Sequence, residues 1–199
     1  LGVFDRNLAT LKKYFPKASA FHLAKFLHDI LLYDRGAHLE AYMKEAGSLT
    51  GLYKDEKLIT RALRTLTKTY FIKDEVFVAH QMISPLMKHR EVQLYSKLGK
   101  SYKTEHINRP HFDLFGKSIE FDINPKEWML KCMRHLRIFR FILPSWHKKE
   151  KLIASKIRHE VLEVIPKLKD EAARGRLVEI ENIKGYREVR YEQFEKVFG

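Results

Sequence analysis

The sequence predicts a mainly α-helical fold, a single helical domain over residues 1–199 with a small irregular or β-hairpin insert around residues 100–124. Apolar residues recur at three- and four-residue spacings through most of the chain, which is the pattern of amphipathic helices. Gly, Pro and small polar residues separate these stretches. The composition, 45% hydrophobic and 32% charged over 199 residues, is that of a chain with a packed core and not of a disordered segment.

Short amphipathic helices are predicted for the first half of the chain, residues 8–98. Asp5 or Asn7 is the candidate N-cap of the first helix, because short polar side chains accept hydrogen bonds from the free amides of a first turn. Gly47 and Pro85 mark helix breaks, since glycine favours helix ends and proline cannot continue a helix. We expect six helices. The first ends near residue 14, and the other five span about residues 19–33, 37–46, 55–69, 73–84 and 86–98.

A change of pattern in residues 99–124 predicts the insert. This stretch contains Gly and Pro together with two short alternating runs, at 102–107 and 118–123, that are typical of a β-hairpin. Asn124 as N-cap and Pro125 in the first turn then predict that helix resumes. That helix is expected to reach about residue 141, followed by helices at about 148–165 and 167–181 and by a short last helix ending at residue 198.

The charge balance favours anionic partners. Lys and Arg number 38 against 25 Asp and Glu, a formal net charge of +13. Such a surplus suits a nucleic acid, an anionic membrane or an acidic protein partner. No apolar run reaches the roughly eighteen residues that a membrane-spanning helix needs, and no signal peptide is apparent, so we expect no membrane association.

The number of cysteines limits which disulfide and metal sites the chain can form. The single cysteine, Cys132, excludes a disulfide, a four-cysteine zinc site and a cysteine-bound iron–sulfur cluster formed within this chain. A reducing, cytoplasmic location is therefore expected. The first residue is Leu and not Met, which suggests that the sequence is part of a longer product.

A basic helix after Pro125 is the first candidate binding element. Residues 126–158 contain ten Lys or Arg against only two acidic residues. On this helix an apolar face is predicted from Met129, Cys132, Met133 and Leu136, with the cations around the opposite side. The functional interpretation is a surface that binds a phosphate-bearing ligand or an acidic subunit, and the alternative is an ordinary solvated face. The candidate anion- or partner-binding residues are Lys131, Arg134, Arg137 and Arg140.

Nucleic-acid binding is the alternative function, that of a stand-alone basic helical module. Arg137, Arg140, Trp146, His147 and Lys148 combine cations with an aromatic ring that can stack on a base. No zinc-finger spacing, no heptad array after a basic helix and no signature of the common RNA-binding sheet accompanies them.

Catalytic and metal-binding patterns are weak. Cys132 and His135 are the only close Cys/His pair at helical spacing, and two ligands do not complete a metal site, so no metal site is predicted. His106, His111 or His147 would serve a hydrolase-like enzyme only if the fold brought them together with a carboxylate. The chain has no phosphate-binding glycine loop, serine elbow or paired-histidine zinc motif. The sequence therefore shows no active site.

Five segments, in order along the chain, carry a resemblance to a known family. Residues 70–79, YFIKDEVFVA, look like a Tyr-Lys-Asp-Glu-Tyr-Glu-Val-Ala signature, and residues 183–186, IKGY, resemble an Ile-Arg/Lys-Gly-Tyr/Phe-Gly turn in which Arg187 replaces the last glycine. The other segments are residues 32–42, residues 102–106 and residues 128–130 with the Arg-rich helix that follows. Together they resemble the C-terminal helical region of indolepyruvate oxidoreductase-type members of the thiamine-dependent 2-oxoacid:acceptor oxidoreductase family.

The resemblance implies a larger parent enzyme. Such an enzyme oxidatively decarboxylates an aryl 2-oxoacid, transfers the acyl group to coenzyme A and reduces ferredoxin. Thiamine diphosphate, magnesium and iron–sulfur clusters would be held by its other domains, and no cofactor is assigned to this chain.

The same resemblance implies a non-catalytic accessory role, with the chain excised from or C-terminal to a larger oxidoreductase polypeptide. It would pack on the catalytic or acyl-acceptor domains or subunits. The basic helix would contact an acidic neighbour or the phosphates of coenzyme A. Lys184, Gly185 and Tyr186 are the candidate structural or interface turn.

Overall fold

The computed structural model describes residues 2–53, 55–72, 74–96, 111–114, 117–120, 124–136, 140, 147–185 and 188–199. It confirms the mainly α-helical fold. The chain divides into two compact units, one formed by Leu1–Ile72 with Lys149–Gly199 and the other by Lys73–Lys148. The single-domain assignment of residues 1–199 stays a prediction. Within the described ranges, no helix combines the length and the apolarity that crossing a membrane requires.

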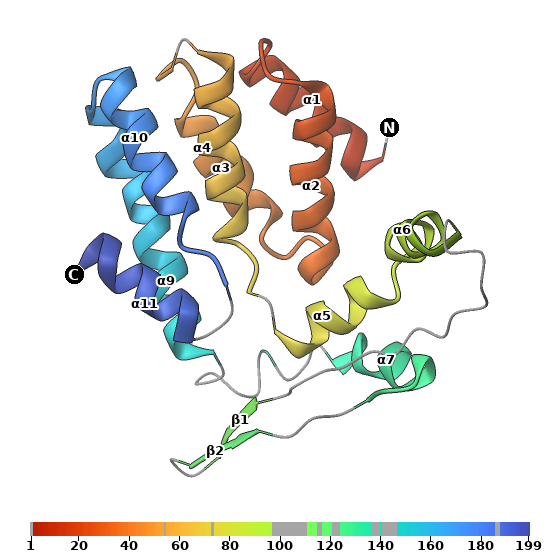
Figure 1. Cartoon of the computed structure of the whole chain (residues 1–199). Helices are drawn as coiled ribbons and strands as arrows, with labels where there is room; N and C mark the ends of the chain where they lie inside the picture. The colour runs from red at the N-terminus through yellow and green to blue at the C-terminus, as the bar shows by residue number, and fades with distance from the viewer. Residues whose placement is uncertain are drawn as a thin grey trace. The chain divides into compact units, whose positions relative to one another are not determined.

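Helices form the first unit. It contains α1 (Val3–Tyr14), α2 (Ala20–Asp34), α3 (Leu39–Ser48), α4 (Glu56–Lys68), α9 (Lys148–His159), α10 (Asp170–Glu181) and α11 (Glu188–Phe198) (Figure 1). The observed bounds of α2 and α4 lie within a residue or two of the predicted ranges. At the start of α4 the Asp55 side chain accepts a hydrogen bond from the Lys57 amide, so a local cap determines where this helix begins.

Two predicted helix ends in the first unit are wrong. α1 begins at Val3, so Asp5 and Asn7 are inside the helix, and the Asn7 side-chain amide donates to the Val3 carbonyl at 2.8 Å instead of capping. Gly47 lies within α3 and not at its end. A Cβ atom at Gly47 would sit 3.2 Å from the Tyr14 ring, so this glycine allows a close helix contact.

α4 is the central helix of the first unit. Apolar residues at helical spacing are buried along it, among them Leu58, Leu63 and Leu66, each at most 1% exposed. α4 packs against α2, α3 and α10 and against a π-helical turn, Glu160–Val164. A helix that is apolar around much of its circumference must be covered on several sides, and α4 is covered in this way.

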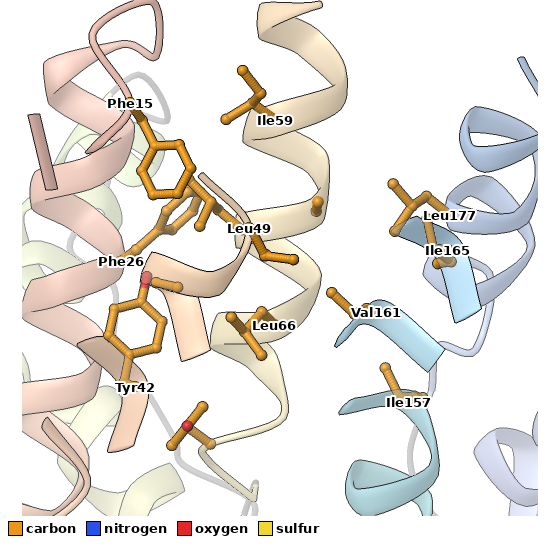
Figure 2. Packing of buried hydrophobic residues seen from close by; sticks show 14 of the residues in the cluster. Phe15, Phe26, Tyr42, Leu49, Ile59, Leu66, Ile157, Val161, Ile165 and Leu177 are labelled. Carbon is orange, nitrogen blue, oxygen red and sulfur yellow. The ribbon is translucent and has the colours of Figure 1, made fainter. Parts of the chain in front are cut away.

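The core therefore extends on both sides of α4. Figure 2 shows Phe15, Phe26, Tyr42 and Leu49 on one side and Ile157, Val161, Ile165 and Leu177 on the other. Residues from both ends of the chain thus belong to one hydrophobic cluster.

α9 ends earlier than the predicted residue 165. It stops at His159 and is followed by the π-helical turn and by a 3-10 turn, Ile165–Lys167. Pro166 lies in that 3-10 turn, and proline has no amide hydrogen and crowds the preceding turn. The change of helix type still leaves Val161 and Ile165 fully buried.

Three helices and two strands make up the described part of the second unit. They are α5 (Glu75–Met82), α6 (Pro85–Tyr95), β1 (His111–Leu114), β2 (Lys117–Glu120) and α7 (Glu127–Met133) (Figure 1). Ser84 caps α6 by accepting from the Met87 amide at 3.2 Å, with Pro85 in the first turn. The predicted break at Pro85 is thus confirmed. β1 and β2 pair antiparallel, with His111 opposite Glu120.

α7 differs from its prediction in start and orientation. It begins at Glu127, and its N-cap is Lys126 and not Asn124. Fully buried Leu130 packs with Ala79 and Ile83. The predicted apolar face is wrong in part, because Cys132 and Leu136 are exposed while Leu130 and partly buried Met133 contact that cluster. Residues 137–139 and 141 of the predicted helix lie outside the described residues.

Two leucines test the position of the core in the first unit. Leu63 is 0% exposed on α4, whereas Leu152 on α9 is 65% exposed. We expect Leu63→Ala to lower the free energy of unfolding by about 2–5 kcal/mol, because the truncation removes buried contacts and leaves a cavity. The matched control Leu152→Ala should change it by less than about 0.5 kcal/mol. Urea unfolding followed by circular dichroism measures both values, and equal losses would contradict this core.

Candidate functional site

The predicted cations of the basic helix occupy different environments. Lys131 is exposed, and half-buried Arg134 donates from Nε to Nε2 of His135 at 3.2 Å. Arg140 is mostly buried, and its guanidinium faces Asp74. Arg137 lies outside the described residues. The structure therefore places Lys131 and Arg134 at the surface of α7 but directs Arg140 into the second unit.

Glu127, at the start of α7, is paired with two lysines. Its Oε1 accepts from Lys88 Nζ at 2.7 Å and lies 3.1 Å from Lys131 Nζ. Hydrogen bonds from Lys88, then from Lys131, lower the pKa of Glu127 to about 2. Lys88 belongs to α6, so this pair of ammonium groups also links α6 to α7 within the second unit.

Apolar side chains lie at the surface beside these charges. Trp128 is 62% exposed and Leu136 is 41% exposed, and Cys132 between them is exposed as well. Residues four apart share one side of a helix, so the three form a ridge along α7 and the turn that follows it. Lys131 borders this ridge at the neighbouring position on the helix surface.

Four ionisable residues gather in the second unit in what we name the Asp74 cluster: Asp74, Glu75, Arg140 and His147. Asp74 Oδ1 accepts from the Phe77 amide at 2.7 Å, which caps α5, and also from Arg140 Nη2 at 2.8 Å. Arg140 Nε donates to Asp74 Oδ2 at 2.5 Å. His147 Nε2 lies 3.1 Å from Glu75 Oε2. Both carboxylates are buried; the Arg140 guanidinium compensates the lost hydration of Asp74, and the His147 ring gives Glu75 a polar contact.

A second set, the Tyr70 cluster of Glu45, Thr69, Tyr70 and Arg158, lies in the first unit. The Tyr70 hydroxyl donates to Glu45 Oε2 at 2.5 Å. The Arg158 guanidinium stacks over the Tyr70 ring, 4.0 Å from its centroid, and donates to the Thr69 carbonyl at 2.9 Å. Arg158 Nε donates to the Thr69 hydroxyl at 3.1 Å. The cluster ties the end of α4 to α3 and α9.

The phenols near this cluster are held protonated. Burial, then the hydrogen bond to the Glu45 carboxylate, raises the pKa of Tyr70 well above its ordinary value of 10. Burial raises the pKa of Tyr42 to about 12, and its hydroxyl lies 3.2 Å from that of Thr67. A tyrosine that stays neutral donates a hydrogen bond but is a poor base or nucleophile, so both phenols suit structural roles.

The predicted turn at residues 184–186 requires its glycine. Gly185 has a φ of +99°, and a Cβ atom there would approach Val189 Cγ1 to 2.8 Å. A side chain at this position would therefore be strained and would collide. Lys184 is exposed, and Tyr186 lies outside the described residues.

Of the three histidines that were candidates for a catalytic site, the structure describes the side chain of His147. His147 contacts Glu75, whereas His106 and the side chain of His111 lie outside the described residues. Among the described side chains, no group of three or more His, Cys, Asp or Glu is arranged to hold a metal ion.

Sequence reasoning missed the Tyr70 cluster. Its members come from α3, the end of α4 and α9, and Thr69 and Arg158 are 89 positions apart. Of the cluster's members, the sequence pattern of residues 70–79 includes only Tyr70.

Comparison of the chain with protein-family models, with curated protein sequences and with solved structures finds no match.

Replacing Asp74 tests the Asp74 cluster. Asp74→Ala removes the α5 cap and leaves the mostly buried Arg140 without this carboxylate, so we expect α5 to lose about 3–5 kcal/mol of protection. Asp74→Asn keeps a capping acceptor and should lose less. Hydrogen exchange of the α5 amides measures the effect, with exposed Glu127→Ala as the control. Unchanged exchange in Asp74→Ala would contradict the cluster's role.

The ion pairs of Glu127 predict its titration. Because the folded-state pKa is lowered, the pairing contributes stability above the ordinary value of 4.5, and this contribution is lost as pH falls towards 2. Lys88→Met should move the pKa of Glu127 back towards 4.5, since the hydrogen bond from Lys88 is the largest single cause of the shift. Side-chain carboxyl NMR titration measures this, and Lys148→Met, at another exposed lysine, is the control. A midpoint near 4.5 in the unaltered chain would refute the pairing.

Proposed function

We propose that this chain is a non-catalytic accessory module of an indolepyruvate-type 2-oxoacid:ferredoxin oxidoreductase and packs on the enzyme's catalytic or acyl-acceptor domains. The observation that carries the proposal is the engagement of Tyr70, Asp74 and Glu75 in contacts within their own units. These residues belong to the 70–79 segment, the most distinctive part of the resemblance.

The chemistry of these residues supports an accessory role. Asp74 is bound to Arg140 and to a helix amide, so using it as a base would break a buried ion pair. Tyr70 keeps its proton, because its pKa is raised. Side chains so engaged stabilise a scaffold, which is the task of a module that positions other domains.

The cofactors of such an enzyme would be held outside this chain. An iron–sulfur cluster needs several cysteine ligands, and this sequence has only Cys132, so the chain does not fit one. Thiamine diphosphate and magnesium are assigned to the catalytic domains. For this chain, Lys131 and Arg134 are the proposed cations towards an acidic neighbour or the phosphates of coenzyme A.

Isolation of the native complex tests the proposal. The chain, tagged in its source cells, should be recovered with a polypeptide that binds thiamine diphosphate and iron–sulfur clusters, or as part of it. Intact mass and cofactor analysis identify that polypeptide. Recovery of the chain alone, or with nucleic acid whose binding weakens steeply with salt, would overturn the proposal.

Charge reversal on α7 provides the matched comparison. Lys131→Glu with Arg134→Glu should lower recovery of the catalytic polypeptide, because cations there are proposed to face an acidic neighbour. Lys17→Glu with Lys57→Glu reverses two exposed lysines of the first unit and should leave recovery unchanged. Equal recovery for both pairs would count against α7 as the docking element.

A further inference from the structure

The Asp74 cluster joins the two ends of the second unit. Asp74 and Glu75 lie directly after the first residue of Lys73–Lys148, and Arg140 and His147 lie close to its last residue. The Arg140 guanidinium donates to both carboxylate oxygens of Asp74, and His147 Nε2 lies 3.1 Å from Glu75 Oε2. The stretch of chain that begins the second unit is therefore held to the stretch that ends it.

Burial makes the loss of these contacts costly. The Asp74 side chain is 3% exposed and the Arg140 side chain is 13% exposed. Two N–H groups of one guanidinium bind the two oxygens of one carboxylate, a paired geometry that arginine supplies and lysine does not. Removing the guanidinium would leave the Asp74 carboxylate buried without this cation, which is strongly destabilising.

The apolar core in the described part of the second unit is small. Leu130 of α7 packs with Ala79 and Ile83 of α5, and partly buried Met82 and Met133 pack against this cluster. α6 contributes no buried residue. The core of the first unit, by contrast, draws on α1, α2, α3, α4, α9 and α10. A region with few buried apolar contacts opens at a lower free energy than a large core, so the second unit depends more on its ionic contacts.

The first unit has its own link between the stretches of chain that flank the insertion. Arg158 follows the second unit in sequence, and Thr69 precedes it. Arg158 Nη2 donates to the Thr69 carbonyl at 2.9 Å, and Arg158 Nε donates to the Thr69 hydroxyl at 3.1 Å. Both residues belong to the first unit, so this link and the core around α4 do not require the contacts of the Asp74 cluster.

We infer that the Asp74 cluster is a clasp, a set of ionic contacts that closes the second unit and whose release opens that unit as a whole while the first unit stays folded. The pair of Asp74 and Arg140 is its main contact, and Glu75 with His147 adds a second one. Release of the clasp exposes the small core around Leu130. The inference goes beyond the proposed function and does not depend on it, because opening is a property of the chain by itself.

Hydrogen exchange of the full chain, followed by mass spectrometry, tests the clasp. Arg140→Met removes the paired donors and keeps an unbranched side chain. We expect amide exchange in α5 and α7 to rise together at least about 100-fold, the effect of removing one partner of a buried ion pair. Exchange in α4 should not change, because α4 lies in the core of the first unit. Arg140→Lys keeps the charge without the paired donors and should give a smaller rise.

Arg176→Met is the matched control in the first unit. Arg176 Nε donates to Oε1 of buried Glu160 at 2.6 Å, so this variant also removes the cation of a buried carboxylate. We expect it to raise amide exchange in α10 and in the π-helical turn, and to leave exchange in α5 and α7 unchanged.

The pattern of exchange decides the inference. A joint rise in α5 and α7 with α4 unchanged supports the clasp. Equal rises in α4, α5 and α7 would show that the chain opens as one cooperative body and would overturn it. A rise confined to α5 would reduce the role of Asp74 to that of a helix cap, which also overturns the clasp. If Arg140→Met does not fold, Arg140→Lys provides the same comparison, and unchanged exchange in that variant counts against the inference.

Discussion

Burial of α4 on opposite sides is the constraint on which the first unit depends. α2 and α3 pack on it from the N-terminal part of the chain, and α10 and the π-helical turn pack on it from the C-terminal part. The unit is thus formed by Leu1–Ile72 together with Lys149–Gly199. Neither part alone covers α4, so the ends of the chain must meet to complete one core. The second unit, Lys73–Lys148, is therefore an insertion in the sequence of the first.

Arginine side chains add hydrogen bonds and ring stacking to this apolar packing. Arg176 donates to Glu160 in the π-helical turn at 2.6 Å and stacks on Phe198 of α11 at 4.9 Å. Arg190 on α11 donates to buried Glu150 on α9 at 2.5 Å. α11 itself contributes no buried residue, so these planar cations hold it by bonds of defined geometry. Four partly buried side chains of α11, Tyr191, Phe194, Val197 and Phe198, also pack against the core, so apolar contact and paired charge together position the C-terminal helix.

Local signals made much of the fold predictable, and contacts between distant residues account for the rest. Helical spacing and Pro85 place α2, α4 and the start of α6 because these depend on neighbouring residues. The burial of Leu130 in place of Cys132 depends on where α5 lies, which no spacing within residues 124–141 contains. For the candidate site, the sequence singled out exposed Lys131, but the Asp74–Arg140 pair joins residues 66 positions apart. The contact between Asp74 and Arg140 could therefore be found only from the folded structure.

The net charge of +13 overstates how much cationic surface is available to a partner. Arg140, Arg158, Arg176 and Arg190 are engaged with internal acceptors and are at most 31% exposed. Their charge is used in building the two units and is a poor guide to binding. What distinguishes a binding surface is therefore not the number of cations but their position beside exposed apolar groups. On α7, exposed Lys131 lies three residues after Trp128 and therefore next to it on the helix surface, whereas Arg134 lies about 120° around the helix from that ring.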